Sequence, residues 1–263
     1  MARFEAHPQR RPALVTGASS GIGEATAWAL HEQGHPVVVA ARRTERLETL
    51  ATKISADGGE ALAVELDLAA PDSIDRCATT ALEAFGEIDI VVANAGVVGP
   101  YTALGADPDV FCTNVQVNLL GTQRLLSHLG PSMVEQGHGD IVFVTSDVVV
   151  RPRTHMSSYV AAKAGLEGLA RAMQMELEGT GVRAGMVRPG PSSTEQGTDW
   201  DEDTINHIIP TWQHWGLLRH NGALQPINVA NAIVTMVSVP KGTHLTLIEI
   251  EPEAPVRPER TYR

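Results

Sequence analysis

The feature that most restricts the fold of this chain is a regular alternation of short apolar runs and longer amphipathic stretches. The apolar runs are rich in Ala, Val, Leu and Ile and are bounded by turn residues. This order is typical of a parallel sheet with helices on both faces, because parallel strands are buried on both sides and are joined by crossover helices. We expect strands at residues 13–16, 36–41, 61–66, 88–93, 140–146, 182–188 and 245–250. The intervening helices are expected at residues 22–33, 44–56, 71–85, 113–135, 157–178 and 228–237.

The chain shows neither a fixed-period repeat nor a low-complexity linker. We therefore predict a single α/β domain over residues 11–251, with a doubly wound, seven-stranded parallel sheet. Residues 1–10 are expected to form an N-terminal extension. The Pro-rich, charged residues 252–263 are expected to form a tail that packs on a neighbour or frays.

Composition excludes several classes of partner. The formal net charge of -11 argues against a protein that binds the phosphate backbone of nucleic acids, because such proteins need a basic face. No apolar run approaches the length of a membrane span, and residues 1–12 lack the apolar core of a signal peptide. The two cysteines, Cys77 and Cys112, have neither metal-type spacing nor a disulfide pattern. We expect a cytoplasmic protein with no nucleic acid, membrane or metal partner.

A glycine-rich turn follows the first expected strand and leads directly into a helix. It reads Thr16-Gly17-Ala18-Ser19-Ser20-Gly21-Ile22-Gly23. Glycine allows a tight turn and close backbone approach, and the free amides and dipole of a helix start favour a pyrophosphate. The turn thus predicts a dinucleotide cradle, although a flexible turn with no ligand has the same composition.

Tyr159 and Lys163 form the second chemical signal. Their spacing of four places phenol and ammonium on one face of a helix. A free tyrosine has a pKa of about 10. A neighbouring cation lowers such a pKa by roughly 1–3 units, which favours acid–base chemistry at neutral pH. The alternative is a surface pair, but the chain has few tyrosines and lysines, so a chance pair at this spacing is rare.

With these residues in hand, the chain resembles the short-chain dehydrogenase/reductase family over residues 11–251. The resemblance implies a Rossmann-type fold and a catalytic set made of Asn118, Ser146, Tyr159 and Lys163. Ser146 would donate a hydrogen bond to a substrate carbonyl while Tyr159 delivers the proton. Lys163 would lower the tyrosine pKa and bind the nicotinamide ribose, and Asn118 would hold a water that links Lys163 to solvent. Asn118 taken alone would more often be a structural residue inside a helix.

Together with the glycine-rich turn, the family motifs give the expected cofactor contacts. These are Gly17, Ser19, Ser20, Gly21, Ile22, Gly23, Arg42, Arg43, Asp67, Leu68, Asn94, Ala95, Gly96, Tyr159, Lys163, Pro189, Gly190 and Thr194. Asp67 would accept from the adenine amine, or alternatively cap the helix that begins near Pro71. Thr194 would hold the carboxamide.

The end of the second expected strand predicts NADP(H) rather than NAD(H). An acidic side chain there would bind the 2′-hydroxyl of the adenosine ribose, but the sequence reads Ala40-Ala41-Arg42-Arg43. Arg42 and Arg43 instead offer planar donors to a 2′-phosphate. A solvated basic pair is the alternative, and it leaves the missing acid unexplained.

Three positions depart from the family pattern or invite a second role. Ala93 replaces the first Asn that often precedes the Asn-Ala-Gly motif, which removes only a supporting hydrogen bond. Asp147 directly follows Ser146, and we expect a solvated loop carboxylate there rather than a substrate contact. His155 lies four residues before Tyr159, and we expect a loop or helix-entry residue rather than a second base.

The alternation of strands and helices stops within residues 190–226, the expected substrate loop, where Trp200, Trp212 and Trp215 gather. Within residues 198–218, apolar side chains recur at helical spacing, and acidic residues favour a helix N-terminus before them. The apolar residues are Ile205, Ile208, Ile209, Trp212 and Trp215, and the acidic ones are Asp201, Glu202 and Asp203. The segment is either a mobile lid that closes on a bulky hydrophobic substrate or a stripe packed permanently on the core or a neighbouring subunit.

These features predict an NADP(H)-linked oxidoreductase that reduces a ketone or aldehyde, or oxidises a secondary alcohol. The family resemblance also implies a homotetramer or homodimer packed through the long helices near Thr113 and Ser157. Two other functions remain: a non-catalytic cofactor-binding regulator or scaffold, and a sugar-nucleotide epimerase or dehydratase. The intact catalytic set argues against the first, and the absence of room for a larger C-terminal substrate domain argues against the second.

Overall fold

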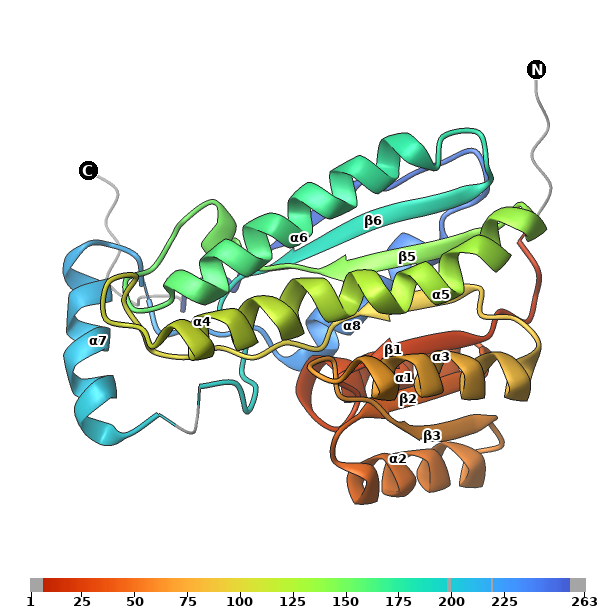
Figure 1. Cartoon of the computed structure of the whole chain (residues 1–263), viewed down its shortest axis with the longest axis horizontal. Coiled ribbons are helices and arrows are strands. Elements are labelled where there is room, and N and C mark those ends of the chain that lie inside the picture. Colours follow the sequence, from red (N-terminus) through yellow and green to blue (C-terminus); the bar gives the residue numbers. More distant parts are fainter. Residues whose placement is uncertain (1–6, 198–199, 219, 256–263) are drawn as a thin grey trace.

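A seven-stranded sheet forms the centre of the protein in a computed structural model, which describes residues 7–197, 200–218 and 220–255 (Figure 1). The strand order is β3-β2-β1-β4-β5-β6-β7, and every pairing is parallel. The strands are β1 (Ala13–Thr16), β2 (Val37–Ala41), β3 (Ala61–Glu65), β4 (Ile90–Ala93), β5 (Gly139–Val144), β6 (Val182–Pro189) and β7 (Leu247–Ile250). The predicted doubly wound sheet is confirmed. Most of the predicted tail and residues 1–6 of the predicted extension lie outside the described residues.

Helices connect the strands and cover both faces of the sheet. They are α1 (Gly21–Glu32), α2 (Thr44–Ala56), α3 (Pro71–Phe85), α4 (Pro108–Val115), α5 (Gly121–Gln136), α6 (Ser157–Glu176), α7 (Glu202–His214) and α8 (Pro226–Ser238). The predicted single helix over residues 113–135 is wrong at its start. The helical segment begins at Pro108, where the Asp107 side chain accepts from the backbone N–H of Asp109, and a π-helical turn, Gln116–Leu120, separates α4 from α5.

Two hydrophobic clusters lie on opposite faces of the sheet. Side chains from α3, α5 and α6 pack on one face, and side chains from α1, α2 and α8 pack on the other. Because successive strand residues point to opposite faces, Leu14 of β1 enters the first cluster and Val15 enters the second. Both faces are therefore closed, which leaves the ends of the strands as places for a ligand.

Charged side chains gather at the amino ends of β1, β4, β5 and β6, opposite the edge where the glycine-rich turn lies. Arg11 donates to Asp89 at 3.0 Å and also to Asp140, and all three side chains are buried. Arg183 donates to Asp140 at 2.7 Å. These ion pairs connect strands that are distant in sequence. We call Arg11, Asp89, Asp140 and Arg183 the amino-edge cluster.

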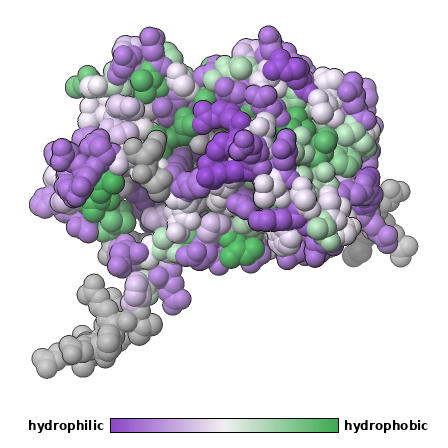
Figure 2. Space-filling model, turned by 90° about the horizontal axis from the view of Figure 1, so that it is seen from below, coloured by the Kyte–Doolittle hydropathy of each residue, from purple (hydrophilic) through white to green (hydrophobic). Residues whose placement is uncertain are grey.

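The outer surface is mostly hydrophilic on the side where α2 lies. Figure 2 shows that side, with hydrophobic residues in separate small groups and no continuous apolar band. Among the described residues, no helix combines the length and apolar character needed to cross a membrane.

Candidate functional site

Two neighbouring cavities open at the carboxyl ends of the central strands. The first has a volume of about 380 Å³ and the second of about 460 Å³, and Ile22, Asn94 and Thr194 are among the residues that line both. The strand order reverses direction between β1 and β4. In doubly wound sheets, ligands bind in the crevice at such a reversal.

The two cavities bring together most of the predicted site residues. The second cavity is lined by Gly17, Ser19, Ser20, Gly21, Ile22, Arg42, Arg43, Asp67, Leu68, Asn94, Ala95, Gly96 and Thr194. The first cavity is lined by Ser146, Tyr159, Lys163, Pro189 and Gly190 among others. Gly23 and Asn118 are not among the residues that line these two cavities.

The glycine-rich turn has the shape of a dinucleotide cradle. Gly17 has a φ of 70°, and a Cβ there would lie 2.9 Å from the Cα of Ala95. A Cβ on Gly23 would lie 2.3 Å from the carbonyl oxygen of Gly17, so Gly23 lets α1 approach the turn. The amides at the start of α1 therefore remain open to the second cavity, where an anion is favoured.

Asn94 ties this turn to the end of β4. Its Nδ2 donates to the carbonyl oxygen of Thr16 at 2.9 Å, and its backbone N–H donates to Thr16 Oγ1 at 3.0 Å. The backbone N–H of Ala95 donates to the same hydroxyl at 2.9 Å. Asn94 thus fixes the wall of both cavities by bonding to backbone.

Arg43 occupies the outer end of the second cavity. Its Nε donates to Ser19 Oγ at 3.1 Å and its Nη2 to Ser20 Oγ at 2.6 Å. Arg43 and Arg46 each donate to the carboxylate of Glu195 at 2.7 Å, and these hydrogen bonds lower the pKa of Glu195 to about 2. Arg42 is exposed and also lines this cavity. Arg46 and Glu195 were not among the predicted site residues, although a third arginine one helical turn after the pair was an available signal for Arg46.

Asp67 does not cap α3. The residue at the cap position is Ala70, and no side chain bonds there. Asp67 Oδ1 instead accepts from the backbone N–H of Ala69 at 2.9 Å, while the Asp67 backbone N–H donates to Ser73 Oγ at 3.0 Å. The helix-cap alternative is therefore wrong, and the Asp67 carboxylate lies in the wall of the second cavity.

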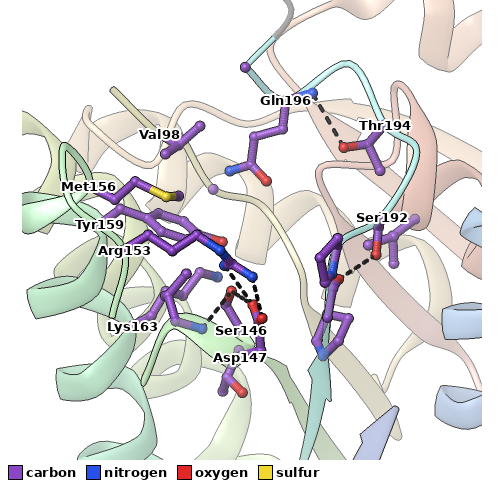
Figure 3. A pocket seen from close by; sticks show the side chains of 18 of the residues that line it. Val98, Ser146, Asp147, Arg153, Met156, Tyr159, Lys163, Ser192, Thr194 and Gln196 are labelled. Atoms are coloured by element: carbon purple, nitrogen blue, oxygen red, sulfur yellow. Dashed lines mark hydrogen bonds and ion pairs between the residues drawn. The ribbon is translucent and has the colours of Figure 1, made fainter. Parts of the chain in front are cut away.

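Ser146, Tyr159 and Lys163 converge on the first cavity from the end of β5 and the first turns of α6 (Figure 3). Tyr159 and Lys163 are buried. Lys163 Nζ donates to the carbonyl oxygen of Val144 at 2.8 Å and lies 5.7 Å from the centroid of the Tyr159 ring. The predicted spacing of phenol and ammonium on one helix face is present.

Burial dominates the protonation of both groups. It lowers the pKa of Lys163 to about 8. Burial also raises the pKa of Tyr159, while hydrogen bonds with Ser146 and Gln196 act in the opposite direction. The expected lowering of the tyrosine pKa by Lys163 is therefore not the dominant effect in the protein alone, because removal from water disfavours the phenolate more strongly.

Asn118 lies in the π-helical turn, and both the nitrogen and the oxygen of its side-chain amide form hydrogen bonds with backbone groups. Its Nδ2 donates to the carbonyl oxygens of Val97 at 2.9 Å and Asn114 at 2.8 Å, and its Oδ1 accepts from the Val97 N–H at 3.1 Å. A Cβ on Gly96 would lie 2.6 Å from that Oδ1. Asn118 therefore fixes the loop after β4 behind the first cavity.

Asp147 is not the solvated loop carboxylate expected from the sequence. Its side chain is buried and forms a bidentate ion pair with Arg153, whose Nη1 donates to Oδ1 at 3.0 Å and whose Nη2 donates to Oδ2. The prediction failed because the partner lies six residues later, at the far end of the same loop. Both residues line the first cavity (Figure 3).

The remaining wall of the first cavity comes from the substrate loop and α7. Trp200 and Trp212 meet edge to face with ring centroids 6.3 Å apart, and Trp212 Nε1 donates to the carbonyl oxygen of Thr154 at 3.0 Å. Trp215 is exposed and does not join them, so the expected gathering of three tryptophans is wrong for that residue. Asp201 caps α7 by accepting from the Thr204 N–H at 2.8 Å, as the acidic residues predicted.

His155 lies just before α6, and this part of its expected role is confirmed. It has a φ of 63°, and its ring meets that of His207 at 5.3 Å between centroids. His155 does not line either cavity. Gln196 was missed by the sequence analysis, although it hydrogen-bonds to Tyr159 from the substrate loop.

Comparisons with known proteins identify similar chains. A model of the family described as short chain dehydrogenase matches residues 11–205. A short chain dehydrogenase of Pseudocercospora fijiensis is 34% identical over 206 residues, which cover 78% of this chain and 66% of that protein. A 3-oxoacyl-(acyl-carrier-protein) reductase of Synechocystis sp. is 33% identical over 235 residues, which cover 89% of this chain and 92% of that protein. The structure of an alcohol dehydrogenase from the archaeon Thermococcus sibiricus, complexed with 5-hydroxy-NADP, has a TM-score of 0.81 and 30% identity, and the match covers 95% of this chain and 100% of that one.

Proposed function

This chain belongs to the short-chain dehydrogenase/reductase family of oxidoreductases, and from that premise we propose that it interconverts a ketone or aldehyde and an alcohol with NADP(H). The observation that carries the proposal is the convergence of Ser146, Tyr159 and Lys163 on one cavity that adjoins the dinucleotide cradle. A hydride donor in the cradle would then lie beside the proton donor.

In the reductive direction, Ser146 donates a hydrogen bond to the substrate carbonyl oxygen, and Tyr159 transfers its hydroxyl proton to the same oxygen. A bound nicotinamide supplies the hydride to the carbonyl carbon. Lys163 stabilises the phenolate left on Tyr159 and would hold the ribose hydroxyls of the cofactor by hydrogen bonds. Oxidation of a secondary alcohol uses the same groups in reverse.

The cradle fits the proposed cofactor. Only a residue without a Cβ fits at Gly17, and the helix start beside it favours a pyrophosphate. Ser19, Ser20 and Arg43 offer donors at the outer end, where a 2′-phosphate would bind. The alcohol dehydrogenase of similar fold carries an NADP derivative, which supports the same choice.

A panel of aliphatic and aromatic ketones and aldehydes, followed by the absorbance of NADPH, tests the proposed reaction. We expect NADPH oxidation that depends on both the carbonyl compound and the enzyme. Absence of turnover across the panel, together with absence of alcohol oxidation by NADP⁺, would contradict it.

Arg43→Ala should shift the cofactor preference toward NADH. Loss of a hydrogen bond to a charged group lowers kcat/KM with NADPH by roughly 10- to 100-fold, while NADH, which lacks the phosphate, should lose much less. The measurement is the ratio of kcat/KM for the two cofactors. Arg10→Ala is the matched control, because Arg10 forms a surface ion pair with Glu60 far from the cavities. Equal or better kcat/KM with NADH in the parent protein would reverse the assignment.

We also propose that α7 and the adjoining loop act as a lid over a bulky, largely apolar substrate. Ile208 and Trp212 are buried against Met156 and Tyr159, whereas Ile205 on the same helix and Trp215 just after its end are exposed. Figure 1 shows α7 at one end of the sheet, apart from the two helical layers. A small contact of this kind is compatible with opening.

Hydrogen exchange separates a lid from fixed packing. Backbone amides of α7 should exchange fast in the protein alone and become strongly protected when cofactor and substrate are both present. Amides of α1 and α8, which pack on the sheet, serve as the internal control. Uniformly slow exchange in α7 without ligand would show that it is a permanent part of the scaffold.

The quaternary structure and location follow the same proposal. Leu120, Val134 and Met175 are exposed apolar residues on or beside α5 and α6, which lie on the same side of the sheet in Figure 1. We propose that two or four copies associate through these helices. The free thiols of Cys77 and Cys112 suit a reducing compartment such as the cytoplasm.

A further inference from the structure

A buried ion pair interrupts the apolar wall of the first cavity. The side chains of Asp147 and Arg153 are only 4% and 8% exposed. Much of the surrounding wall is apolar, and Arg153 lies over the Trp212 ring at 5.8 Å from Cζ to the centroid. The acid–base chemistry proposed above uses neither charge.

Stability gives a weak reason for such a pair. Removing two charges from water costs about as much as their attraction returns, so apolar residues of similar volume often serve as well. The pair also lies at a cavity surface rather than between packed elements. This position favours a role toward what enters the cavity.

The guanidinium of Arg153 has donors to spare. It carries five N–H groups, and Asp147 accepts one from Nη1 and one from Nη2. Among the residues that the structure describes, no second acceptor bonds to this guanidinium. A ligand that enters the cavity and carries an acceptor can bond to these remaining donors.

Asp147 places these donors close to the reacting centre. Its Oδ1 lies 3.4 Å from Ser146 Oγ and 3.0 Å from Arg153 Nη1. Because both atoms contact the same oxygen, the distance between Ser146 Oγ and Arg153 Nη1 cannot exceed the sum of these two distances. One small molecule can reach both, with one oxygen at Ser146 and a second oxygen at Arg153.

We propose that the Asp147–Arg153 pair is a substrate-recognition site for a second, uncharged carbonyl oxygen next to the carbonyl that is reduced. This inference rests on the proposed function for the first carbonyl. Asp147 neutralises Arg153, and its carboxylate repels another anion at this distance. The site therefore selects esters, thioesters, amides and ketones over free carboxylates. The substrate class is that of neutral dicarbonyl compounds.

A matched pair of ketones tests the proposal. Ethyl benzoylacetate has a second carbonyl near the benzoyl group, and hexanophenone has the same chain length without it. We expect kcat/KM with NADPH to be roughly 10- to 100-fold higher for the ester, the effect of one hydrogen bond to a charged group. Ethyl acetoacetate should likewise exceed acetoacetate, because only the latter is an anion.

The double variant Asp147→Asn/Arg153→Met removes both charges and leaves no buried charge unpaired. It should lose the advantage of ethyl benzoylacetate and retain turnover of hexanophenone. Met156→Leu, on another part of the same wall, is the volume-conserving control and should change both substrates alike. An equal loss of kcat/KM for both ketones in the double variant would overturn the proposal, because it would show that the ion pair only supports the fold of the cavity wall.

Binding separates failure of this site from failure of the proposed reaction. Quenching of Trp200 and Trp212 fluorescence reports occupation of the cavity whether or not hydride moves. A lower Kd for ethyl benzoylacetate than for hexanophenone, lost in the double variant, supports the recognition site even without turnover. Turnover of both ketones with equal Kd values in the parent protein overturns it and leaves the proposed reaction intact.

Discussion

Tyr159→Phe should lose most of its turnover while the protein still folds and binds cofactor. The change removes only the hydroxyl that is proposed to exchange the proton, and groups of this kind contribute about 100- to 10,000-fold. Because burial holds the pKa of Tyr159 above its ordinary value, the hydroxyl is protonated and able to donate at neutral pH. The measurement is kcat for the best ketone of the panel at saturating NADPH.

Tyr101→Phe is the matched control for this variant. Tyr101 lies on the exposed loop after β4 and does not line either cavity, so removal of its hydroxyl should leave kcat within a factor of about two. Unchanged cofactor affinity in Tyr159→Phe would show that the loss is chemical. Near-normal kcat in that variant would show that Tyr159 is not the proton donor.

Lys163→Met should produce a more stable but nearly inactive protein. Burial lowers the pKa of Lys163 to about 8, so at neutral pH the fold carries a charged group that would be better solvated in the unfolded chain. This lowering of the Lys163 pKa from 10.5 corresponds to a destabilisation of the folded protein by roughly 3 kcal/mol. The variant would escape this cost but lose the hydrogen bond to Val144, which is worth about 1 kcal/mol. We expect a gain of about 2 kcal/mol in the free energy of unfolding at pH 7, with kcat reduced by about 100-fold or more.

The pH dependence distinguishes this cause from better packing. Between about pH 8 and the ordinary lysine pKa near 10.5, the unfolded chain binds a proton at Lys163 that the folded protein has lost. Stability of the parent should therefore rise with pH in this window relative to Lys163→Met. Tyr159 acts in the opposite direction above about pH 10, but it does so in both proteins. Urea unfolding from pH 7 to 10 measures the difference, and a gap between the two proteins that does not narrow with pH would contradict the explanation.

The sheet was predictable because its pattern is local and repeated. Each strand, such as Val37–Ala41, is a short apolar run with turn residues beside it, and the observed ends differ from the expected ones by at most two residues. The positions of Gly17 and Tyr159 followed in the same way, since a strand–turn–helix and a spacing of four on a helix are both readable in sequence.

The misses share a physical reason, which is that they depend on a partner chosen by the fold. The carboxylate of Asp147 was expected to lie in solvent, but it is buried because Arg153, at the end of the same loop, forms an ion pair with it. Glu195 meets Arg43 across more than a hundred residues of sequence. The start of α4 is a different case, because Asp107 before Pro108 is a helix-start signal that the sequence itself contains.

The amino-edge cluster has a consequence for engineering. Arg11, Asp89, Asp140 and Arg183 hold the strands together at the amino ends of the sheet, while the residues that line the two cavities lie at the carboxyl ends. Redesign of the cavity wall therefore leaves the ion pairs that join the strands untouched. The loops at the carboxyl ends of the strands can therefore be replaced one at a time to accept new substrates, while the ion pairs at the amino ends keep the strands in place.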